Sequence, residues 1–142
     1  MSQYVKGYRL ERRVEQLYSQ HGWLVTRFPK SGRGLYPADV LAVKRLGNKT
    51  LIHLIECKNL SKKEQKERSI YIEPEKIRKI IEVAQEHEAS AFVVCSFPRR
   101  HPRILPAETL RSSGKSLSIR REDGISLKKF LSRLNRVQAL QK

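Results

Sequence analysis

The sequence predicts a single α/β domain in which helices flank a mixed central β-sheet. Three observations predict this class. The chain has 142 residues, the usual length of one domain. Apolar residues recur at helical spacing near both ends of the chain and in one central segment. Between these segments lie short runs rich in β-branched and aromatic residues. We therefore expect one domain over residues 1–142, without an internal repeat or a linker.

Three segments carry the apolar periodicity of an amphipathic helix. In residues 7–21 the periodic pattern stops before Gly22, which stands where a C-terminal cap is expected. Pro74 suits the first turn of a second helix, and Ser126 suits the N-cap of a third. The apolar stripes consist of Leu10, Val14, Leu17 and Tyr18 in the first helix, Ile77, Ile80, Ile81 and Ala84 in the second, and Leu127, Phe130, Leu131, Leu134 and Val137 in the third.

The remaining apolar runs predict strands. They cover residues 23–28, 39–44, 50–58, 69–72 and 90–97, a short stretch near 104–105, and an edge strand at 117–121. The pair Gly47-Asn48 favours positive φ, so the two strands around it should form a β-hairpin whose second strand is central. Residues 29–37 and 59–68 are expected to be loops. The main elements then follow the order α-β-β-β-α-β-β-α.

The charge of the chain indicates a polyanionic partner. Lysine and arginine number 30 against 14 aspartate and glutamate, which gives a net charge of +16. The basic residues are spread along the whole chain and are not confined to a tail. Such a field attracts polyanions. Nucleic acid is the leading partner, because no basic amphipathic segment with an aromatic face suggests residence on a membrane surface.

Several other protein classes are disfavoured. A run of about 18 apolar residues is missing, so a membrane-spanning helix is not expected. The first residues are polar and charged, unlike a secretory signal, and we expect a cytoplasmic protein. The two cysteines, Cys57 and Cys95, lie in apolar runs and lack the spacing of a zinc site. We expect buried free thiols in preference to a disulfide.

Three ionisable residues stand at the ends of predicted apolar strands. Asp39 opens the first strand of the hairpin, and Glu56 and Lys58 close the second. Side chains two apart on a strand share a face, so Glu56 and Lys58 should point into the same space. Counted back from Gly47-Asn48, Asp39 and Glu56 lie at comparable distances from the turn. Antiparallel pairing can therefore bring both carboxylates within reach of one cation.

Two neighbouring carboxylates form a hard oxygen site that suits Mg²⁺, with Mn²⁺ as a substitute. Such a cation supports phosphodiester hydrolysis by supplying a nucleophilic water and neutralising charge on the phosphate. Lys58, beside two carboxylates, should stay charged, so we assign it electrostatic stabilisation before general-base work. Solvated charges or a simple salt bridge are the alternative interpretation of the same three residues.

Two short motifs and several longer segments resemble a known nuclease family. P-A-D at 37–39 and E-C-K at 56–58 resemble the PD-(D/E)XK signature, with Ala38 inserted between the usual proline and aspartate. Residues 7–23, the Ser-Gly pair at 31–32, the helix after 70–72 and residues 123–131 resemble archaeal-type Holliday junction resolvases. The similarity runs nearly from end to end. It implies a restriction-endonuclease-like fold.

The resemblance also implies roles for individual residues. Glu11, Asp39 and Glu56 are implied metal ligands, Lys58 is the motif lysine, and Ser31 matches a loop serine associated with catalysis. Arg12 and Arg27 match basic positions implicated in activity or DNA contact. One departure concerns the second helix, where many proteins of the superfamily carry a glutamine facing the metal and this chain has Glu75 and Lys76. We therefore do not assign Lys76 to catalysis.

The family implies a Mg²⁺-dependent endonuclease that cuts two opposing strands of a four-way DNA junction symmetrically as a homodimer. The last helix and the strand at 90–97 are candidate dimer surfaces, although core packing explains their apolar content equally well. Contacts to the DNA arms are expected from basic residues in predicted loops. These are Lys30, Arg33, Lys62, Lys63, Lys66, Arg99, Arg100 and Arg103.

Two other functions are compatible with the sequence. The first is another PD-(D/E)XK endonuclease, of the restriction or repair type, with the same metal chemistry and a different substrate. The second is a non-catalytic basic DNA-binding module, for which the charge of +16 is sufficient explanation and the acidic pair is accidental. Substrate choice separates the first from a resolvase, and substitution of the acidic pair separates the second.

Overall fold

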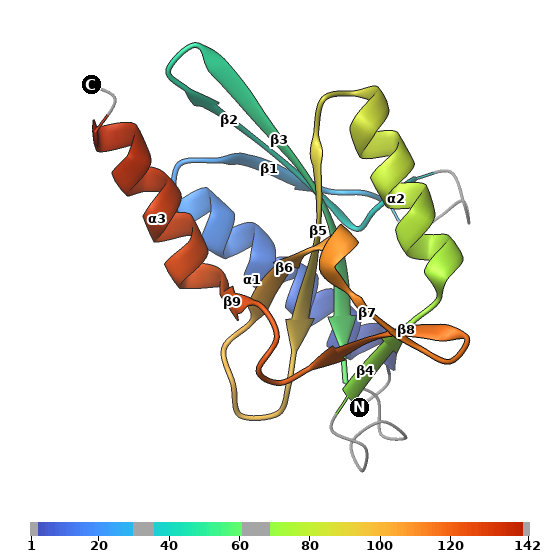
Figure 1. Ribbon diagram of the computed structural model, residues 1–142. Coiled ribbons are helices and arrows are strands. Elements are labelled where there is room, and N and C mark those ends of the chain that lie inside the picture. Colours follow the sequence, from blue (N-terminus) through green and yellow to red (C-terminus); the bar gives the residue numbers. More distant parts are fainter. Residues whose placement is uncertain (1–2, 30–35, 61–68, 141–142) are drawn as a thin grey trace.

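Two β-sheets and three helices make up the described part of the chain (Figure 1). The computed structural model describes residues 3–29, 36–60 and 69–140. The helices are α1 (Gln3–Gln20), α2 (Pro74–Glu86) and α3 (Leu127–Leu140), and a short 3₁₀ helix is η2 (Ala107–Thr109). The strands are β1 (Leu24–Arg27), β2 (Val40–Leu46), β3 (Lys49–Asn59), β4 (Ser69–Ile72), β5 (Ser90–Ser96), β6 (Arg103–Pro106), β7 (Arg111–Ser113), β8 (Ser116–Arg120) and β9 (Ile125–Ser126).

The central sheet is mixed, as the sequence predicts. It has six strands in the order β1-β2-β3-β5-β6-β9. β3 and β5 run parallel, and every other neighbouring pair is antiparallel. The predicted hairpin is β2-β3, closed by Gly47-Asn48 with Gly47 at φ +63°. β3 is the longest strand and lies between β2 and β5, which confirms that the second hairpin strand is central.

A second, three-stranded sheet differs from the prediction. β4, β8 and β7 pair in that order and are antiparallel throughout. The segment predicted as an edge strand at 117–121 is therefore the middle strand of a separate sheet. Ile70 on β4 and Ile119 on β8 face each other in the register and are fully buried. Burial of this apolar pair holds the small sheet against the core.

The helices cover the central sheet on both faces (Figure 1). Leu17 of α1 and Leu131 of α3 pack in one core cluster with Ile55 of β3. Ile80 of α2 packs in the other cluster with Leu54 of β3. Because side chains alternate along a strand, Glu56 lies on the same face of β3 as Leu54, toward α2. The sheet thus separates the α2 side, which receives Glu56, from the side covered by α1 and α3.

Capping signals in the sequence placed two helix ends correctly, whereas α1 begins at Gln3, four residues before the predicted start. Gly22 follows α1 with φ +85°, the conformation expected of a C-terminal cap. The backbone N–H of Lys129 donates to Ser126 Oγ (3.4 Å), which confirms Ser126 as the N-cap of α3. β1 is shorter than predicted, since Trp23 and Phe28 lie outside it. Both cysteines are free, with Cys95 buried and Cys57 half-buried.

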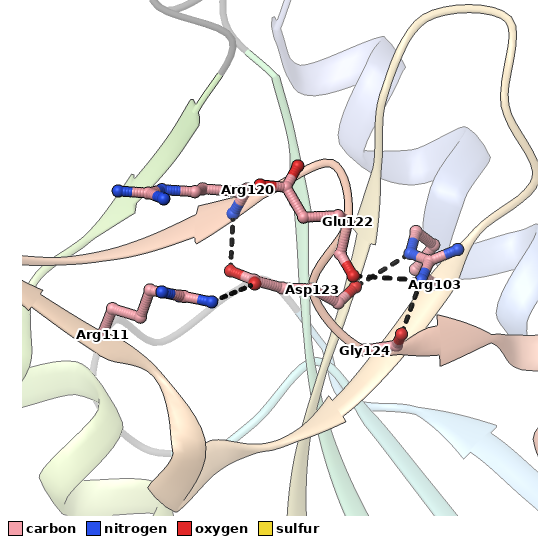
Figure 2. A network of polar contacts seen from close by, with 6 residues as sticks. All are labelled: Arg103, Arg111, Arg120, Glu122, Asp123 and Gly124. Atoms are coloured by element: carbon pink, nitrogen blue, oxygen red, sulfur yellow. Dashed lines mark hydrogen bonds and ion pairs between the residues drawn. The ribbon is translucent and has the colours of Figure 1, made fainter.

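The connection from β8 to β9 is tied to both sheets by Asp123 (Figure 2). Its carboxylate accepts hydrogen bonds from the backbone N–H of Arg120 (2.8 Å) and from the Arg111 guanidinium (3.1 Å). From β6, Arg103 donates to the carbonyl oxygens of Asp123 (2.8 Å) and Gly124 (2.5 Å). These bonds join β6 of the central sheet to β7 and β8 of the small one.

Arg103 therefore differs from its predicted setting. It opens β6 and does not lie in a loop. Its guanidinium donates hydrogen bonds to three successive backbone carbonyls, those of Asp123, Gly124 and, with a longer contact of 3.5 Å, Glu122. A donor committed to satisfying the backbone has less capacity left for a phosphate. The residue has a clear structural role, and DNA contact at this position remains only a prediction.

Candidate active site

The hairpin brings Asp39 close to Glu56. The ladder between β2 and β3 ends at the pair Val40 and Ile55, one residue short of Asp39. Asp39 lies in a bend just before β2, and its backbone N–H donates to the carbonyl oxygen of Ile55 (3.0 Å), one residue out of step with the ladder. The tight two-residue turn and the register therefore bring Asp39 beside the residue that precedes Glu56, although the predicted strand start at Asp39 is wrong by one residue.

The carboxylate of Asp39 is held against β3. Its Oδ2 accepts a hydrogen bond from the backbone N–H of Cys57 at 2.8 Å. Cys57 stands between Glu56 and Lys58 in the chain, so this bond attaches Asp39 to the segment that carries the other two motif residues. A backbone donor fixes the orientation of a carboxylate without occupying its second oxygen. The structure thus brings Asp39 and the E-C-K segment together.

Glu56 is buried and has a cationic partner that sequence analysis did not assign. Only 3% of the residue is exposed. The Nζ of Lys76, in the first turn of α2, lies 2.7 Å from Glu56 Oε1, while 56% of the Lys76 side chain remains exposed. Lys76 stands directly before the buried stripe of α2 that begins at Ile77. It was missed because the contact depends on how α2 docks on the sheet, and spacing within the helix does not encode that docking.

Lys58 lies two residues beyond Glu56 on the same strand and is half-buried. Alternation along β3 directs both side chains to the same face, as expected. In the parallel pairing with β5, Lys58 is level with Cys95, near the end of the shared ladder at Asn59 and Ser96. The ammonium group is therefore carried at the C-terminal end of two parallel strands, beside the acidic pair.

Glu11 lies on α1 and is buried, with 4% of the residue exposed. The pKa of Arg27 is raised, mainly by a hydrogen bond with Tyr8, and the charges of Glu15 and Glu11 add to the increase. Arg27 also stacks over the Tyr8 ring at 4.5 Å. Since Arg27 pairs with Val40 in the β1-β2 register, Glu11 lies within electrostatic reach of the base of the hairpin.

The donor set of the acidic pair fits a hard divalent cation. Asp39 and Glu56 supply carboxylate oxygens, which Mg²⁺ and Mn²⁺ prefer over nitrogen or sulfur. Within the described ranges, no group of three or more His, Cys, Asp or Glu side chains is arranged to hold a metal ion. The assignment of Glu11 as a third metal ligand stays a prediction. Mg²⁺ commonly uses one or two protein carboxylates with waters and a substrate phosphate, so two such groups suffice.

Apart from Arg103, the predicted DNA-contact residues fall into three groups. Arg12 and Arg27 lie on α1 and β1, exposed and half-buried respectively. Arg99 and Arg100 are exposed and line a hollow of about 530 Å³ beyond the ends of β3 and β5, together with His101 and Asn59. Outside the described residues lie Ser31 and the basic residues Lys30, Arg33, Lys62, Lys63 and Lys66.

Comparison with known proteins identifies the family. The family model of the archaeal Holliday junction resolvases (Hjc) matches residues 2–139. The chain belongs to this family. Comparison with curated protein sequences gives no match.

Two solved structures are similar to this family member. One is the Holliday junction resolvase Hjc of the archaeal hyperthermophile Archaeoglobus fulgidus, with a TM-score of 0.71 and 22% identity over 88% of this chain and 99% of that one. The other is a nuclease from a fusselovirus, with a TM-score of 0.59 and 11% identity over 96% of this chain and 93% of that one. The predicted mixed α/β fold is confirmed.

Across the described residues, none of the helices combines the length and the apolar character that crossing a bilayer requires.

Proposed function

We propose that this Hjc family member is a structure-selective DNA endonuclease that resolves four-way (Holliday) junctions by metal-dependent hydrolysis of phosphodiester bonds. Family membership over residues 2–139 supports the nuclease activity and the branched-DNA substrate. The net charge of +16 supports binding to DNA through its phosphates. The product is a pair of symmetric nicks in opposing strands.

One observation carries the chemical part of the proposal. Asp39 Oδ2 accepts the Cys57 N–H at 2.8 Å, so the carboxylate is oriented beside Glu56 and Lys58 before any ligand binds. Preorganised charges need not reorganise as the reaction proceeds, and this accounts for much of electrostatic catalysis. A non-catalytic binding module has no use for two carboxylates gathered beside a lysine where phosphate must be attracted, so the arrangement favours the enzyme.

Each side chain has a defined task in this scheme. Asp39 and Glu56 would hold the divalent cation, proposed to be Mg²⁺ with Mn²⁺ as a substitute. When bound, such a cation lowers the pKa of a coordinated water and neutralises charge on the phosphate. Lys58 places its ammonium group at the same face and stabilises negative charge on the phosphate as it is attacked. Glu11 and Ser31 are proposed to complete the site from α1 and from the segment before residue 36.

Recognition of the DNA is proposed to begin at the hollow beyond β3 and β5. Asn59 follows Lys58 directly in the chain, so Arg99 and Arg100 lie near the proposed cleavage site. Their guanidinium groups can pair with phosphates that flank the one that is cut. Arg12 and Arg27 are proposed to contact DNA from the α1 side, and the basic residues of 30–35 and 61–68 to follow the arms.

The proposal includes a homodimer that acts in the cytoplasm. Two identical sites related by a two-fold axis match a junction whose two cut strands are themselves related by near two-fold symmetry. The two candidate dimer surfaces contribute to the core of the monomer: Val93 and Val94 on β5 and Leu127 and Leu131 on α3 are buried within one chain. These four residues are therefore not available to a partner.

Cleavage of a synthetic four-way junction tests the function. The protein is incubated with the junction and with a linear duplex containing the same sequences, with and without Mg²⁺, and the nicks are mapped on all four strands. We expect Mg²⁺-dependent nicks at symmetric positions in two opposing strands and little cutting of the duplex. Equal cutting of both substrates would indicate a restriction- or repair-type nuclease, and absence of cutting would indicate a binding module.

A further inference from the structure

A groove between the end of α1 and one face of α3 concentrates positive charge that the proposed cleavage reaction does not use. The groove has a volume of about 370 Å³. It is lined by His21, Lys128, Lys129, Ser132, Arg133 and Arg136. The four lysine and arginine side chains are exposed, and no acidic residue takes part in the lining. The whole of α3, LKKFLSRLNRVQAL, contains no aspartate or glutamate.

The spacing of these cations is unfavourable for an isolated helix. Arg133 is four residues from Lys129 and three from Arg136, and side chains at these spacings are neighbours on one face. Like charges at such positions repel and lower helix stability. Among the described residues, none of the ion pairs involves a side chain of this groove. An external polyanion would offset the repulsion among these cations, which have no acidic partners in the groove.

The walls of the groove are held in place by buried and half-buried contacts. The Nζ of Lys44, from β2, donates to the carbonyl oxygen of His21 (2.7 Å) and to Oδ1 of Asn135 on α3 (2.7 Å). His21 in turn donates from Nδ1 to the carbonyl oxygen of Leu17 (2.8 Å). On the inner face of α3, Leu131 is fully buried. The cations are thus presented by a helix docked in a fixed position.

The groove lies away from the candidate active site. α3 packs in the same core cluster as Ile55 of β3, whereas Glu56 points to the α2 side. Glu11, which α1 is proposed to add to the site, precedes His21 by ten residues, roughly 15 Å along a helix. The DNA backbone that reaches the groove is therefore a different segment from the one held at Glu56. A four-way junction offers such segments, because four duplex arms diverge from its branch point.

We propose that the α1-α3 groove binds backbone phosphates of a junction arm, away from the phosphodiester that is cut. The ligand is the sugar-phosphate backbone of double-stranded DNA, recognised by charge and without reading of sequence. This inference rests on the proposed function and adds to it a second DNA-binding surface in each protomer. A site that contacts an arm at a distance from the branch favours a substrate with several arms over one linear duplex.

The salt dependence of binding tests the groove. Lys129→Gln/Arg133→Gln removes two cations from the middle of the groove, and Lys79→Gln/Lys115→Gln removes two exposed lysines elsewhere as a charge-matched control. Binding to a four-way junction is measured in Ca²⁺ over a range of salt concentrations. Each lost phosphate contact lowers the slope of log Kd against log salt by about 0.9, so we expect the groove variant to lose about 2 from the slope and to bind about tenfold more weakly near physiological salt. The control should keep the wild-type slope.

Shortening the arms locates the contact. On a junction whose arms end close to the branch, the wild-type protein and the groove variant should bind with the same slope, since the phosphates that the groove needs are gone. Equal slopes for the groove variant and the control on the long-armed junction would overturn the inference, as would a difference that persists on the short-armed one. Failure of the proposed function itself gives a different result, namely a wild-type protein that leaves the junction uncut in Mg²⁺.

Discussion

Asp39 shows how a single backbone hydrogen bond prepares a carboxylate for chemistry. The bond from the Cys57 N–H satisfies one oxygen, and the side chain loses its rotational freedom in the folded protein. Its neighbour Glu56 is held differently, by a lysine from another element. The two acids are therefore prepared by unequal means, a fixed backbone donor on one and a movable cation on the other.

Replacement of Lys76 should strengthen divalent-cation binding. The ammonium group occupies the carboxylate of Glu56, and a divalent cation must displace it. We expect Lys76→Met to bind Mn²⁺ about fivefold more tightly in the absence of DNA, the equivalent of roughly 1 kcal/mol for a half-exposed ion pair. Calorimetric titration measures this, with Lys79→Met as the control from the next turn of α2. Weaker binding by Lys76→Met would mean that the lysine orients Glu56 and does not compete for it.

His53 should make the stability of the protein sensitive to acid. Burial lowers the pKa of His53 to about 3, and its Nδ1 lies 2.9 Å from the Tyr18 hydroxyl, with which it shares a hydrogen bond. Below about pH 6.5 the unfolded chain protonates this histidine while the folded protein does not, so stability falls as pH drops toward 3 and is independent of this group above 6.5. The loss approaches about 1.4 kcal/mol per pH unit.

Urea unfolding between pH 7 and pH 4 measures that dependence. His53→Gln removes the titrating group. The free energy of unfolding of this variant should therefore fall less steeply with acid than that of the wild type, by up to about 1.4 kcal/mol per pH unit. His87→Gln, at an exposed histidine, should keep the wild-type slope. Identical slopes for His53→Gln and the wild type would show that the imidazole is not held neutral.

At the scale of elements, the connection from β8 to β9 depends on close backbone approach. Gly124 has φ +70°, and a Cβ atom at this position would lie 2.4 Å from the carbonyl oxygen of Ile104. Neither the backbone conformation nor the available space suits an L side chain. The hydrogen bonds from Arg103 of β6 to this turn leave β6 and β9 little freedom to separate.

Substitution of Gly124 tests this packing. Gly124→Ala should lower the free energy of unfolding by about 3 kcal/mol or more, through backbone strain and displacement of β6. Gly114→Ala is the matched control, since Gly114 has a similar φ of +62° but no atom within 4 Å of the added methyl. The control should cost only about 1 kcal/mol. Thermal denaturation of both variants measures the difference, and equal costs would show that the contact with Ile104 relaxes freely.

At the scale of the whole molecule, the elements with strong local signals could be predicted from the sequence. The three helices followed from apolar periodicity and from caps at Gly22 and Ser126, and the hairpin followed from Gly47-Asn48. The pairing of the small sheet could not be predicted in this way. Its strands are only three to five residues long, and Tyr71 pairs with Ser118, far away in the chain. Short segments with distant partners carry too little local pattern to fix their pairing.

The same distinction applies to the candidate site. Asp39 and Glu56 could be placed near each other because both are counted from one tight turn, and the register reaches Val40 and Ile55, the residues next to them. Lys76 and Arg103 could not be placed, because their partners come from other elements brought near by tertiary packing. The position of Glu11 relative to the acidic pair depends on how α1 docks, which periodicity within the helix does not determine.

The charge of the molecule is organised around the central sheet. The hollow with Arg99 and Arg100 lies at the ends of β3 and β5, and the α3 groove lies across the sheet from Glu56. Within a protein of net charge +16, the half-buried Asp39 and the buried Glu56 are thus set among cations on several sides. Such a distribution attracts DNA over a broad surface.

Separation of cleavage from binding tests the central claim most directly. Asp39→Asn and Glu56→Gln are compared with Glu108→Gln, an exposed acid of η2, for single-turnover cutting of a four-way junction in Mg²⁺ and for affinity in Ca²⁺. We predict that both site variants lose about a thousandfold or more in cutting rate while binding the junction within about threefold of the wild type. The control should cut normally. Cutting at the wild-type rate by either site variant would contradict the assignment of the acidic pair to hydrolysis.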